Sequence, residues 1–429
     1  MKNKTIKVDY LARVEGEGGL FISLKNGKVV ESKFNVFEPP RFFEGFLKNR
    51  KFTEAPDITA RICGICPVAY QMSSSHAMEQ ICGVKVDGPL RDLRRLLYCG
   101  EWIESHALHI FMLHAPDFLG YDDAIKMAKD HPDIVKRALK LKKIGNDLMI
   151  KLGGREIHPI NVRVGGFYKV PTRKDLGSFL APLKWALEFS HETVEIVSGF
   201  EFPNLERDYE FVSLRHSDEY PICEGDIVSN KGIDIPIDKF LDFFEEYQVK
   251  HSTSLHARIK ERGDYLVGPM ARFHNNFDML PSSAREAAKK AGLDKSCLNP
   301  YKSIIVRAIE LIFVCEEAIK LIKRYEPPEK SCIECVPIEG VGQGCTEAPR
   351  GILYHRYKID KDGIIQEARI IPPTSQNQKS IENDLRQSVD NNLHLSDEKI
   401  TWLCEQTIRN YDPCISCSCH FLKLKISRD

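Results

Sequence analysis

Two pairs of cysteines stand at opposite ends of this sequence. Cys63 and Cys66 lie near its start and Cys414 and Cys417 near its end, with two residues inside each pair. At that spacing both sulfur atoms of a pair can turn toward one metal ion, and four thiolates suit zinc, iron–sulfur or nickel. A structural zinc site usually has its pairs about 15–20 residues apart within one small module. From spacing alone a zinc site and a redox metal site both remain open, and either one joins the two ends of the chain.

The composition narrows the class of protein. Fourteen cysteines are many for a cytoplasmic chain of this size and cannot form a stable disulfide framework in a reducing compartment, so metal binding or redox chemistry is favoured. The first seven residues lack the apolar core of a signal peptide, and the most apolar helical stretch, 304–322, carries five charged residues. With 61 basic and 61 acidic residues, nothing favours nucleic acid or an anionic membrane. We expect a cytoplasmic protein with no membrane span.

The apolar pattern predicts an α+β fold that is mainly α, a long-helix bundle with a small β region formed from the N- and C-terminal parts. Hairpins are expected around Asn26-Gly27 and Asp362-Gly363, as two matched pieces of one small sheet. Helices are expected within 90–115, 121–150, 176–200, 237–262, 301–325 and 381–410, separated by loops at 153–172 and 326–351. We expect one domain over 1–429: a β region (1–60), a helical bundle (61–330), a C-terminal hairpin, helix and metal motif (331–420), and a tail (421–429).

The residues around the cysteines are more specific than their spacing. Residues 61–66 have the form Arg-x-Cys-Gly-x-Cys, and residues 412–420 the form Asp-Pro-Cys-x-x-Cys-x-x-His. This pair of segments resembles the signature of nickel–iron hydrogenase large subunits. Further motifs similar to that family's follow in order, at 12–16 (ARVEG), 41–44 (RFFE), 153–159 (GGREIHP), 165–166 (GG) and 347–351 (EAPRG). The resemblance therefore runs along the whole chain, and it implies the large-subunit fold and reversible heterolytic cleavage of H2.

By this resemblance the four cysteines hold nickel. Cys66 and Cys417 also bridge to an iron that carries cyanide and carbon monoxide, since a bridging ligand needs sulfur with spare lone pairs. Glu15 matches the family's proton-gate glutamate and is expected to relay protons from Cys414. The alternative for Glu15 is a solvated turn carboxylate.

The resemblance also implies a second metal site. Glu44 and His420 match the family's ligands for magnesium or a similar divalent cation, whose shell is completed by water and a backbone carbonyl. A satisfied core histidine is the alternative for His420.

Four other positions would, by the same resemblance, lie around the open face of the metals. Arg350, beside Pro349, is expected to orient a cyanide nitrogen and polarise the hydrogen-binding position, with Asp412 fixing its pose. Thr374 is expected to donate its hydroxyl to a second cyanide. A surface salt bridge is the alternative for Arg350 and Asp412.

The sequence departs from the commonest family pattern at two positions. Tyr70 stands where a histidine is usual, and Ser105, just before His106, where a second aspartate is usual. These departures and the RFFE motif resemble the NAD(P)-linked bidirectional hydrogenases, also called sulfhydrogenases. His106, His109 and His114 form either a proton relay, part of the wall of the metal site or, more simply, part of the core. Cys332, Cys335 and Cys345 are interpreted as structural, and Cys419 as an incidental buried thiol.

Partners follow from what the chain lacks. It has no complete cysteine set for an iron–sulfur relay and no convincing dinucleotide fingerprint, so the resemblance implies a small subunit with iron–sulfur clusters and diaphorase subunits that bind flavin and NAD(P). Family members are commonly cut after the last histidine by a maturation endopeptidase, so we expect the mature chain to end at His420. The alternatives are a different acceptor (ferredoxin or a deazaflavin), a hydrogen sensor, a nickel-free relative from electron-transport complexes, and a zinc-stapled structural protein.

Overall fold

The computed structural model describes residues 4–420; the expected tail, 421–429, and its removal after His420 lie outside them. The helices are α1 (Phe43–Leu47), α2 (Ala55–Thr59), α3 (Pro67–Ile81), α4 (Gly88–Leu108), α5 (Ala115–Leu119), α6 (Ala124–Asp130), α7 (Pro132–Gly153), α8 (Arg173–Gly177), α9 (Leu180–Ser198), α10 (Phe240–Phe243), α11 (Pro269–Asn276), α12 (Ser282–Lys290), α13 (Ser303–Arg324), α14 (Pro373–Asn391), α15 (Asp397–Arg409) and α16 (Ile415–Ser418). The strands are β1 (Lys4–Val8), β2 (Gly18–Lys25), β3 (Lys28–Val36), β4 (Val162–Arg163), β5 (Gly166–Phe167), β6 (Val212–Arg215), β7 (Asp226–Ser229), β8 (Asp234–Ile235), β9 (Phe244–Tyr247), β10 (His256–Ile259), β11 (Gly340–Ala348), β12 (Gly351–Ile359) and β13 (Ile365–Ile371).

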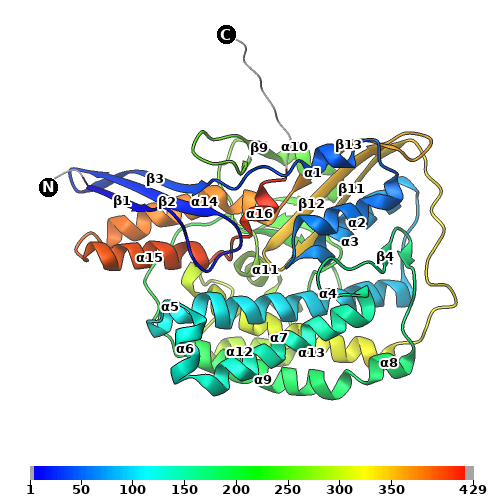
Figure 1. The fold of residues 1–429 in the computed structure, drawn as a ribbon, viewed down its shortest axis with the longest axis horizontal. Helices are drawn as coiled ribbons and strands as arrows, with labels where there is room; N and C mark the ends of the chain where they lie inside the picture. Colours follow the sequence, from blue (N-terminus) through cyan, green and yellow to red (C-terminus); the bar gives the residue numbers. More distant parts are fainter. Residues whose placement is uncertain (1–3, 421–429) are drawn as a thin grey trace, which may run out of the picture.

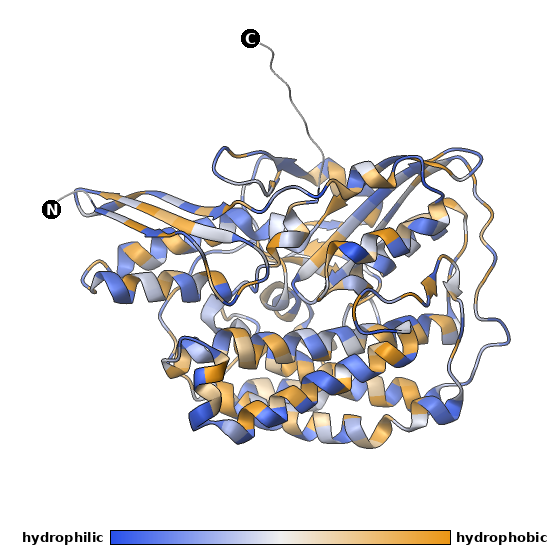
Figure 2. Ribbon diagram, in the orientation of Figure 1, coloured by the Kyte–Doolittle hydropathy of each residue, from blue (hydrophilic) through white to orange (hydrophobic). Residues whose placement is uncertain are grey.

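Four long helices, α4, α7, α9 and α13, form a layer below the strands (Figure 1). Helix α4 packs on α7 and α13, and α13 packs on α9. Figure 2 shows hydrophobic and hydrophilic residues alternating around these helices, as expected for helices with one buried face. Among residues 4–420 no helix is both long and apolar enough to cross a bilayer. The predicted mainly helical α+β fold is confirmed.

Helices α4 and α7 approach closely because glycines face each other at their crossing. A Cβ added at Gly145 would lie 2.6 Å from the carbonyl oxygen of Gly100 and 2.7 Å from the amide nitrogen of Glu104. Side-chain atoms do not fit at such distances, so the two helix backbones touch directly.

The two predicted hairpins form, but not as pieces of one sheet. Asn26 and Gly27 turn between β2 and β3 with φ of 52° and 74°, and β1 completes a sheet of order β1-β2-β3. The second hairpin, β12 and β13, pairs with β11 in a separate sheet. Each hairpin is completed by the strand next to it in sequence, the first sheet packing on α14 and the second on α3. The expectation of a single shared sheet was therefore wrong.

Several predicted boundaries also differ. The window 237–262 is mostly not helical: it contains only the short α10 and a 3-10 turn before the antiparallel pair β9–β10. The window 121–150 breaks at Pro132, and 381–410 divides into α14 and α15, with α14 beginning earlier, at Pro373. Helix α3 and strands β6–β8 were not predicted. Their buried polar residues or short lengths give no clear apolar period.

The ends of the chain meet beside the bundle. Residues 15 and 414 form an isolated parallel bridge, in which the amide of Ile415 donates to the carbonyl oxygen of Glu15 at 2.9 Å. A second bridge joins Lys51 to Ile364. The N-terminal motifs are thereby held against the C-terminal segment that carries the second cysteine pair.

Candidate metal centre

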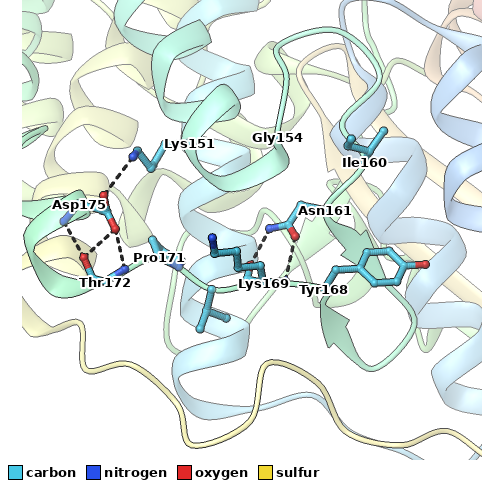
Figure 3. A pocket seen from close by; sticks show the side chains of 10 residues that line it. Lys151, Gly154, Ile160, Asn161, Tyr168, Lys169, Pro171, Thr172 and Asp175 are labelled. Atoms are coloured by element: carbon cyan, nitrogen blue, oxygen red, sulfur yellow. Dashed lines mark hydrogen bonds and ion pairs between the residues drawn. The ribbon is translucent and has the colours of Figure 1, made fainter.

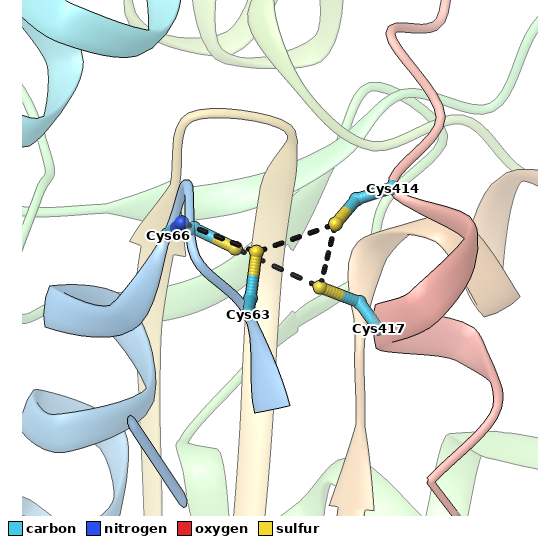
Figure 4. Close-up of side chains that lie close together, drawn as sticks. All are labelled: Cys63, Cys66, Cys414 and Cys417. Atoms are coloured by element: carbon cyan, nitrogen blue, oxygen red, sulfur yellow. Dashed lines mark hydrogen bonds between the residues drawn. The ribbon is translucent and has the colours of Figure 1, made fainter. Parts of the chain in front are cut away.

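The four predicted cysteines converge. Their sulfur atoms all lie within 4.8 Å of one another, and each of the four residues is buried. The shortest separations across the two ends of the chain are 3.3 Å between Cys63 and Cys414 and 3.7 Å between Cys66 and Cys417 (Figure 4). In Figure 4 the first pair comes from the blue N-terminal segment and the second from the red C-terminal one. This set of four soft donors fits a nickel–iron site.

Each pair sits at the start of a helix. Cys66 is the residue before α3, and Cys414 is the residue before α16. The amides of Ile65 and Cys66 donate to the sulfur of Cys63 at 3.3 and 3.2 Å. Such N–H donors stabilise a thiolate, and the first turn of α3 adds its positive end.

The four sulfurs cannot all be thiolates without a cation. Burial alone raises the pKa of Cys63, but hydrogen bonds from the other three sulfurs bring that pKa well below its usual range. Burial raises the pKa of Cys414 well above its usual range and raises that of Cys417 too. Without a metal, Cys63 is therefore the thiolate, and its neighbours Cys414 and Cys417 keep their protons. A bound cation would replace those protons.

Glu15 lies beside the second pair. Its Oε2 lies 3.1 Å from Cys414 Sγ and accepts the amide of Ser416 at 3.0 Å. Burial, together with the negative charge of Cys63, raises the pKa of Glu15, although the donors from Ser416 and Cys414 oppose that rise. The carboxylate is therefore placed to exchange a proton with a cysteine of the cluster.

Arg350 occupies the tip of the β11–β12 hairpin. Residues 347 and 348 belong to β11 rather than to the expected loop, and Ala348 pairs with Gly351 across a two-residue turn. The guanidinium donates from Nε to the Asp412 carbonyl oxygen at 2.6 Å and from Nη2 to Asp412 Oδ1 at 3.1 Å. Its Nη1 is buried and has no partner among residues 4–420, so one strong donor is left for a small anionic ligand.

Thr374 is the second residue of α14 and lies next to the second cysteine pair. Its hydroxyl oxygen accepts the amide of Cys414 at 3.0 Å, which leaves the hydroxyl proton free to donate. The hydroxyl of the neighbouring Ser375 is also buried, with no partner in the described part of the chain. Ser375 was not predicted, because serine next to threonine carries no distinguishing signal.

Glu44 and His420 both contact the backbone of Ile370, His420 at the carbonyl oxygen and Glu44 at the amide. His420 Nε2 lies 2.7 Å from the Ile370 oxygen and 3.9 Å from Glu44 Oε1, and Glu44 Oε1 accepts the Ile370 amide at 2.9 Å. A carboxylate, an imidazole and a carbonyl oxygen suit a hard divalent cation. Glu246 of β9 was not predicted; burial raises its pKa to about 7, and the charge of Glu44 acts in the same direction.

Comparison with known proteins decides the family. The family model described as nickel-dependent hydrogenase matches residues 41–147 and 267–420. The chain belongs to the nickel-dependent hydrogenases. It is 35% identical to sulfhydrogenase 1 subunit alpha of Pyrococcus furiosus and 32% identical to sulfhydrogenase 2 subunit alpha of the same organism, with 98% of this chain and 98% and 100% of those chains covered. The fold matches a crystal structure of an NAD+-reducing [NiFe]-hydrogenase with a TM-score of 0.88 and 23% identity, over 97% of this chain and 99% of that one.

As a nickel–iron hydrogenase large subunit, the chain is an enzyme. Membership of a nickel-dependent family disfavours a zinc-stapled structural protein, and the intact set of four cysteines disfavours a nickel-free electron-transport relative.

Arg41 connects both cysteine segments of this hydrogenase. Its Nη2 donates to the carbonyl oxygen of Ile62 at 2.7 Å and also to that of Ser416. Sequence analysis placed Arg41 in a motif but gave it no role, because its two acceptors lie far apart along the chain.

Glu101 of α4 is a second residue with no predicted role. Its Oε2 accepts the amide of Val68, in the first turn of α3, at 2.7 Å. Burial raises the pKa of Glu101 well above its usual range, despite that donor. A buried acid therefore lies directly beneath the first cysteine segment.

Strained backbone in the hydrogenase coincides with its motifs. Arg13, Phe42, His158 and Asp412 have φ between 51° and 60°, in the left-handed region that side chains rarely adopt. Such strain persists only where the surrounding structure fixes it, and it gathers at functional sites.

Tyr70, one of the two departures from the family pattern, lies close to the sulfurs. Tyr70 is buried, and burial together with the charge of Cys417 raises the pKa of its hydroxyl. His106 pairs with Glu310 at 2.8 Å and His109 with the Arg409 carbonyl at 2.8 Å, as core histidines do. Neither ring nitrogen of His114 has a partner among residues 4–420.

A cavity of about 530 Å³ follows the GGREIHP motif and lies outside the cysteine cluster (Figure 3). Two polar side chains on its wall already have partners within the wall. The side-chain amide of Asn161 bonds the backbone of Lys169, and the carboxylate of Asp175 accepts the hydroxyl of Thr172. None of the predicted site residues lines this cavity.

Proposed function

We propose that hydrogen is cleaved at the four-cysteine cluster, where Cys63, Cys66, Cys414 and Cys417 hold nickel. Cys66 and Cys417 also bind an iron that carries cyanide and carbon monoxide. The observation that carries this proposal is the convergence of four buried sulfurs with a carboxylate 3.1 Å from one of them. When bound, the two metals supply a redox-active, Lewis-acidic position at which H2 is split heterolytically.

The protein's own groups then handle the proton. Cys414 holds it on sulfur, and Glu15 accepts it across the 3.1 Å contact, because the raised pKa of this carboxyl brings it nearer that of a thiol. The amide of Ser416 holds the carboxylate in place during the transfer.

Arg350 and Asp412 shape the open face. The two bonds to Asp412 fix the guanidinium, and its Nη1, which has no partner among residues 4–420, would hold and orient a cyanide ligand of the iron beside Pro349. Thr374 donates to a second cyanide. Glu44, His420 and the carbonyl of Ile370 bind magnesium or a similar cation behind the C-terminal segment.

The electrons leave through other subunits. The similar proteins from Pyrococcus furiosus are alpha subunits, and the matched structure is of an NAD+-reducing enzyme. We propose a small subunit with iron–sulfur clusters, diaphorase subunits that carry flavin and reduce NAD(P), and a cytoplasmic location. A maturation endopeptidase removes the residues after His420, so mass spectrometry of active enzyme showing Asp429 retained would contradict this step.

Metal analysis with infrared spectroscopy tests the central proposal. Purified mature protein should contain one nickel and one iron and absorb in the region of metal-bound carbon monoxide and cyanide, where proteins do not absorb. Cys417→Ser should abolish these bands, whereas Cys404→Ser, a buried cysteine of α15 outside the cluster, should retain them. Zinc alone in the wild-type site would overturn the proposal.

The acceptor is tested separately. Purified complex should reduce NAD+ or NADP+ with H2. Reduction of only ferredoxin or a deazaflavin would replace the NAD(P) proposal without affecting the cluster.

A further inference from the structure

A second group of metal-binding side chains lies apart from the cysteine cluster. His251, His256 and Glu382 each offer a ligand atom, and these atoms lie within 4.8 Å of one another. They come from the loop after β9, from the first residue of β10, and from the middle of α14. Helix α14 packs against β3, which lies beside it in Figure 1, and also against β10. The three residues thus join elements that are far apart in sequence.

His256 is the observation that points to a ligand. Its side chain is 1% exposed, yet neither ring nitrogen has a hydrogen-bond partner among residues 4–420. A buried polar group without a partner destabilises the fold, so such a group in a native structure calls for an explanation, for example a bound ion. Its ring lies edge-on to His251, with the centroids 5.7 Å apart. A neutral imidazole in this position keeps a lone pair for a metal ion.

The other two ligands are already in contact. His251 Nε2 lies 2.6 Å from Glu382 Oε1, which also accepts the amide of Phe34 at 3.3 Å. Ligands at zinc distances of about 2.0–2.2 Å lie roughly 3.0–3.6 Å apart. Small side-chain rotations that open this pair and bring His256 inward would therefore complete three ligands.

We propose that His251, His256 and Glu382 bind Zn2+ or a divalent ion of the same ligand preference, with water as the fourth ligand. Two histidines and one glutamate are a common zinc set, and borderline-soft ions favour imidazole. Water reaches the site through a surface cavity lined by His251 and its neighbours in the loop. The site is independent of the nickel–iron chemistry proposed above.

The ion would fasten the loop that touches the C-terminal metal motif. Thr253, two residues after His251, donates to the carbonyl oxygen of Glu38 at 2.7 Å and lies 3.7 Å from Cys419 Sγ. Lys379 opposes binding, because its ammonium lies 3.2 Å from Glu382 Oε2. Its side chain is 42% exposed, so it can move into solvent when an ion binds.

Titration of the full-length mature enzyme with Co2+ tests the proposal. The enzyme with its cysteine cluster filled should bind a further Co2+ whose spectrum shows ligand-field bands without a thiolate charge-transfer band. His251→Ala and His256→Leu should each weaken this binding by at least roughly tenfold to a hundredfold. His394→Ala, an exposed histidine outside the group, should leave it unchanged. Because Glu44 and His420 can also take Co2+, the assignment depends on these differences.

Lys379→Met is a second test whose expected result, tighter binding, cannot come from misfolding. Removing the competing charge should tighten Co2+ binding by roughly twofold to fivefold. Binding that is equal in the wild type and both histidine variants, or unchanged by Lys379→Met, would overturn the proposal.

Discussion

Replacing Glu15 by glutamine should nearly abolish proton transfer while leaving the metals in place. The glutamine oxygen can still accept the amide of Ser416, now 3.0 Å from Glu15 Oε2, so the backbone of the C-terminal segment stays supported. Cys414 Sγ contacts the same oxygen at 3.1 Å, so a glutamine oxygen in that position keeps both bonds, whereas an amide nitrogen there would lose both. The loss of one such bond destabilises the fold by about 1 kcal/mol.

The effect on exchange is expected to be far larger than the effect on stability. General acid–base groups contribute roughly 10²–10⁴-fold, which corresponds to about 3–5 kcal/mol of barrier at 1.36 kcal/mol per factor of ten. Hydrogen–deuterium exchange by the variant should fall by that factor, because a carboxamide cannot take up the proton that Cys414 releases.

The assay pairs isotope exchange with metal analysis. Nickel and iron content and the infrared bands should match the wild type. Glu17→Gln is the matched control, since Glu17 is an exposed glutamate two residues further along. An exchange rate within about twofold of the wild type would refute the gate role of Glu15, whatever the metal content.

Three further perturbations follow from the structure. In Arg41→Lys the side chain can donate to only one of the two cysteine segments. The variant therefore loses a charge-assisted hydrogen bond of about 1.5–3 kcal/mol, and its nickel content per chain should fall. Full nickel occupancy of the variant would contradict this role of Arg41. Gly145→Ala places a methyl group 2.6 Å from a carbonyl oxygen of α4 and should reduce the free energy of unfolding by roughly 1–3 kcal/mol, measured by denaturant titration; Gly177→Ala, with open space around its Cβ, is the control. Burial raises the pKa of Glu347 to about 7, so the folded chain keeps a proton there that the unfolded chain releases near pH 4.5. The stabilisation from this group is present below pH 4.5 and is lost as the pH rises through 7, by up to roughly 3 kcal/mol of the free energy of unfolding. Glu347→Gln should reduce the dependence of this free energy on pH between 4.5 and 7. The same pH dependence in the variant would exclude Glu347 as its source.

The local sequence was sufficient for the elements with clear signals. Asn26-Gly27 predicted a hairpin because both residues take positive φ, and the apolar periods of 176–200 and 301–325 predicted α9 and α13. Where turn chemistry or short strands compete with a helical period, as in 237–262, the prediction failed. Strands β9 and β10 form there because each supplies the other with hydrogen-bonding partners.

The residues of the site that could be predicted from the sequence are those that stand in short motifs. The two cysteine pairs, Glu15, Arg350 and His420 each stand in such a motif, and the structure brings each of them to one of two adjoining clusters. No sequence pattern indicated the link made by Arg41 or the roles of Ser375 and Glu246. Their importance comes from neighbours hundreds of residues away or from burial alone.

The sequence by itself determined the ligand types: thiolates in pairs, a carboxylate, a guanidinium and a terminal histidine, because metal preference follows from donor chemistry. Only the tertiary structure decided which atoms meet. It separated the two hairpins into different sheets, left one nitrogen of Arg350 without a partner among the described residues, and placed His251 and His256 beside Glu382. Such contacts depend on packing between distant segments, which no local pattern encodes.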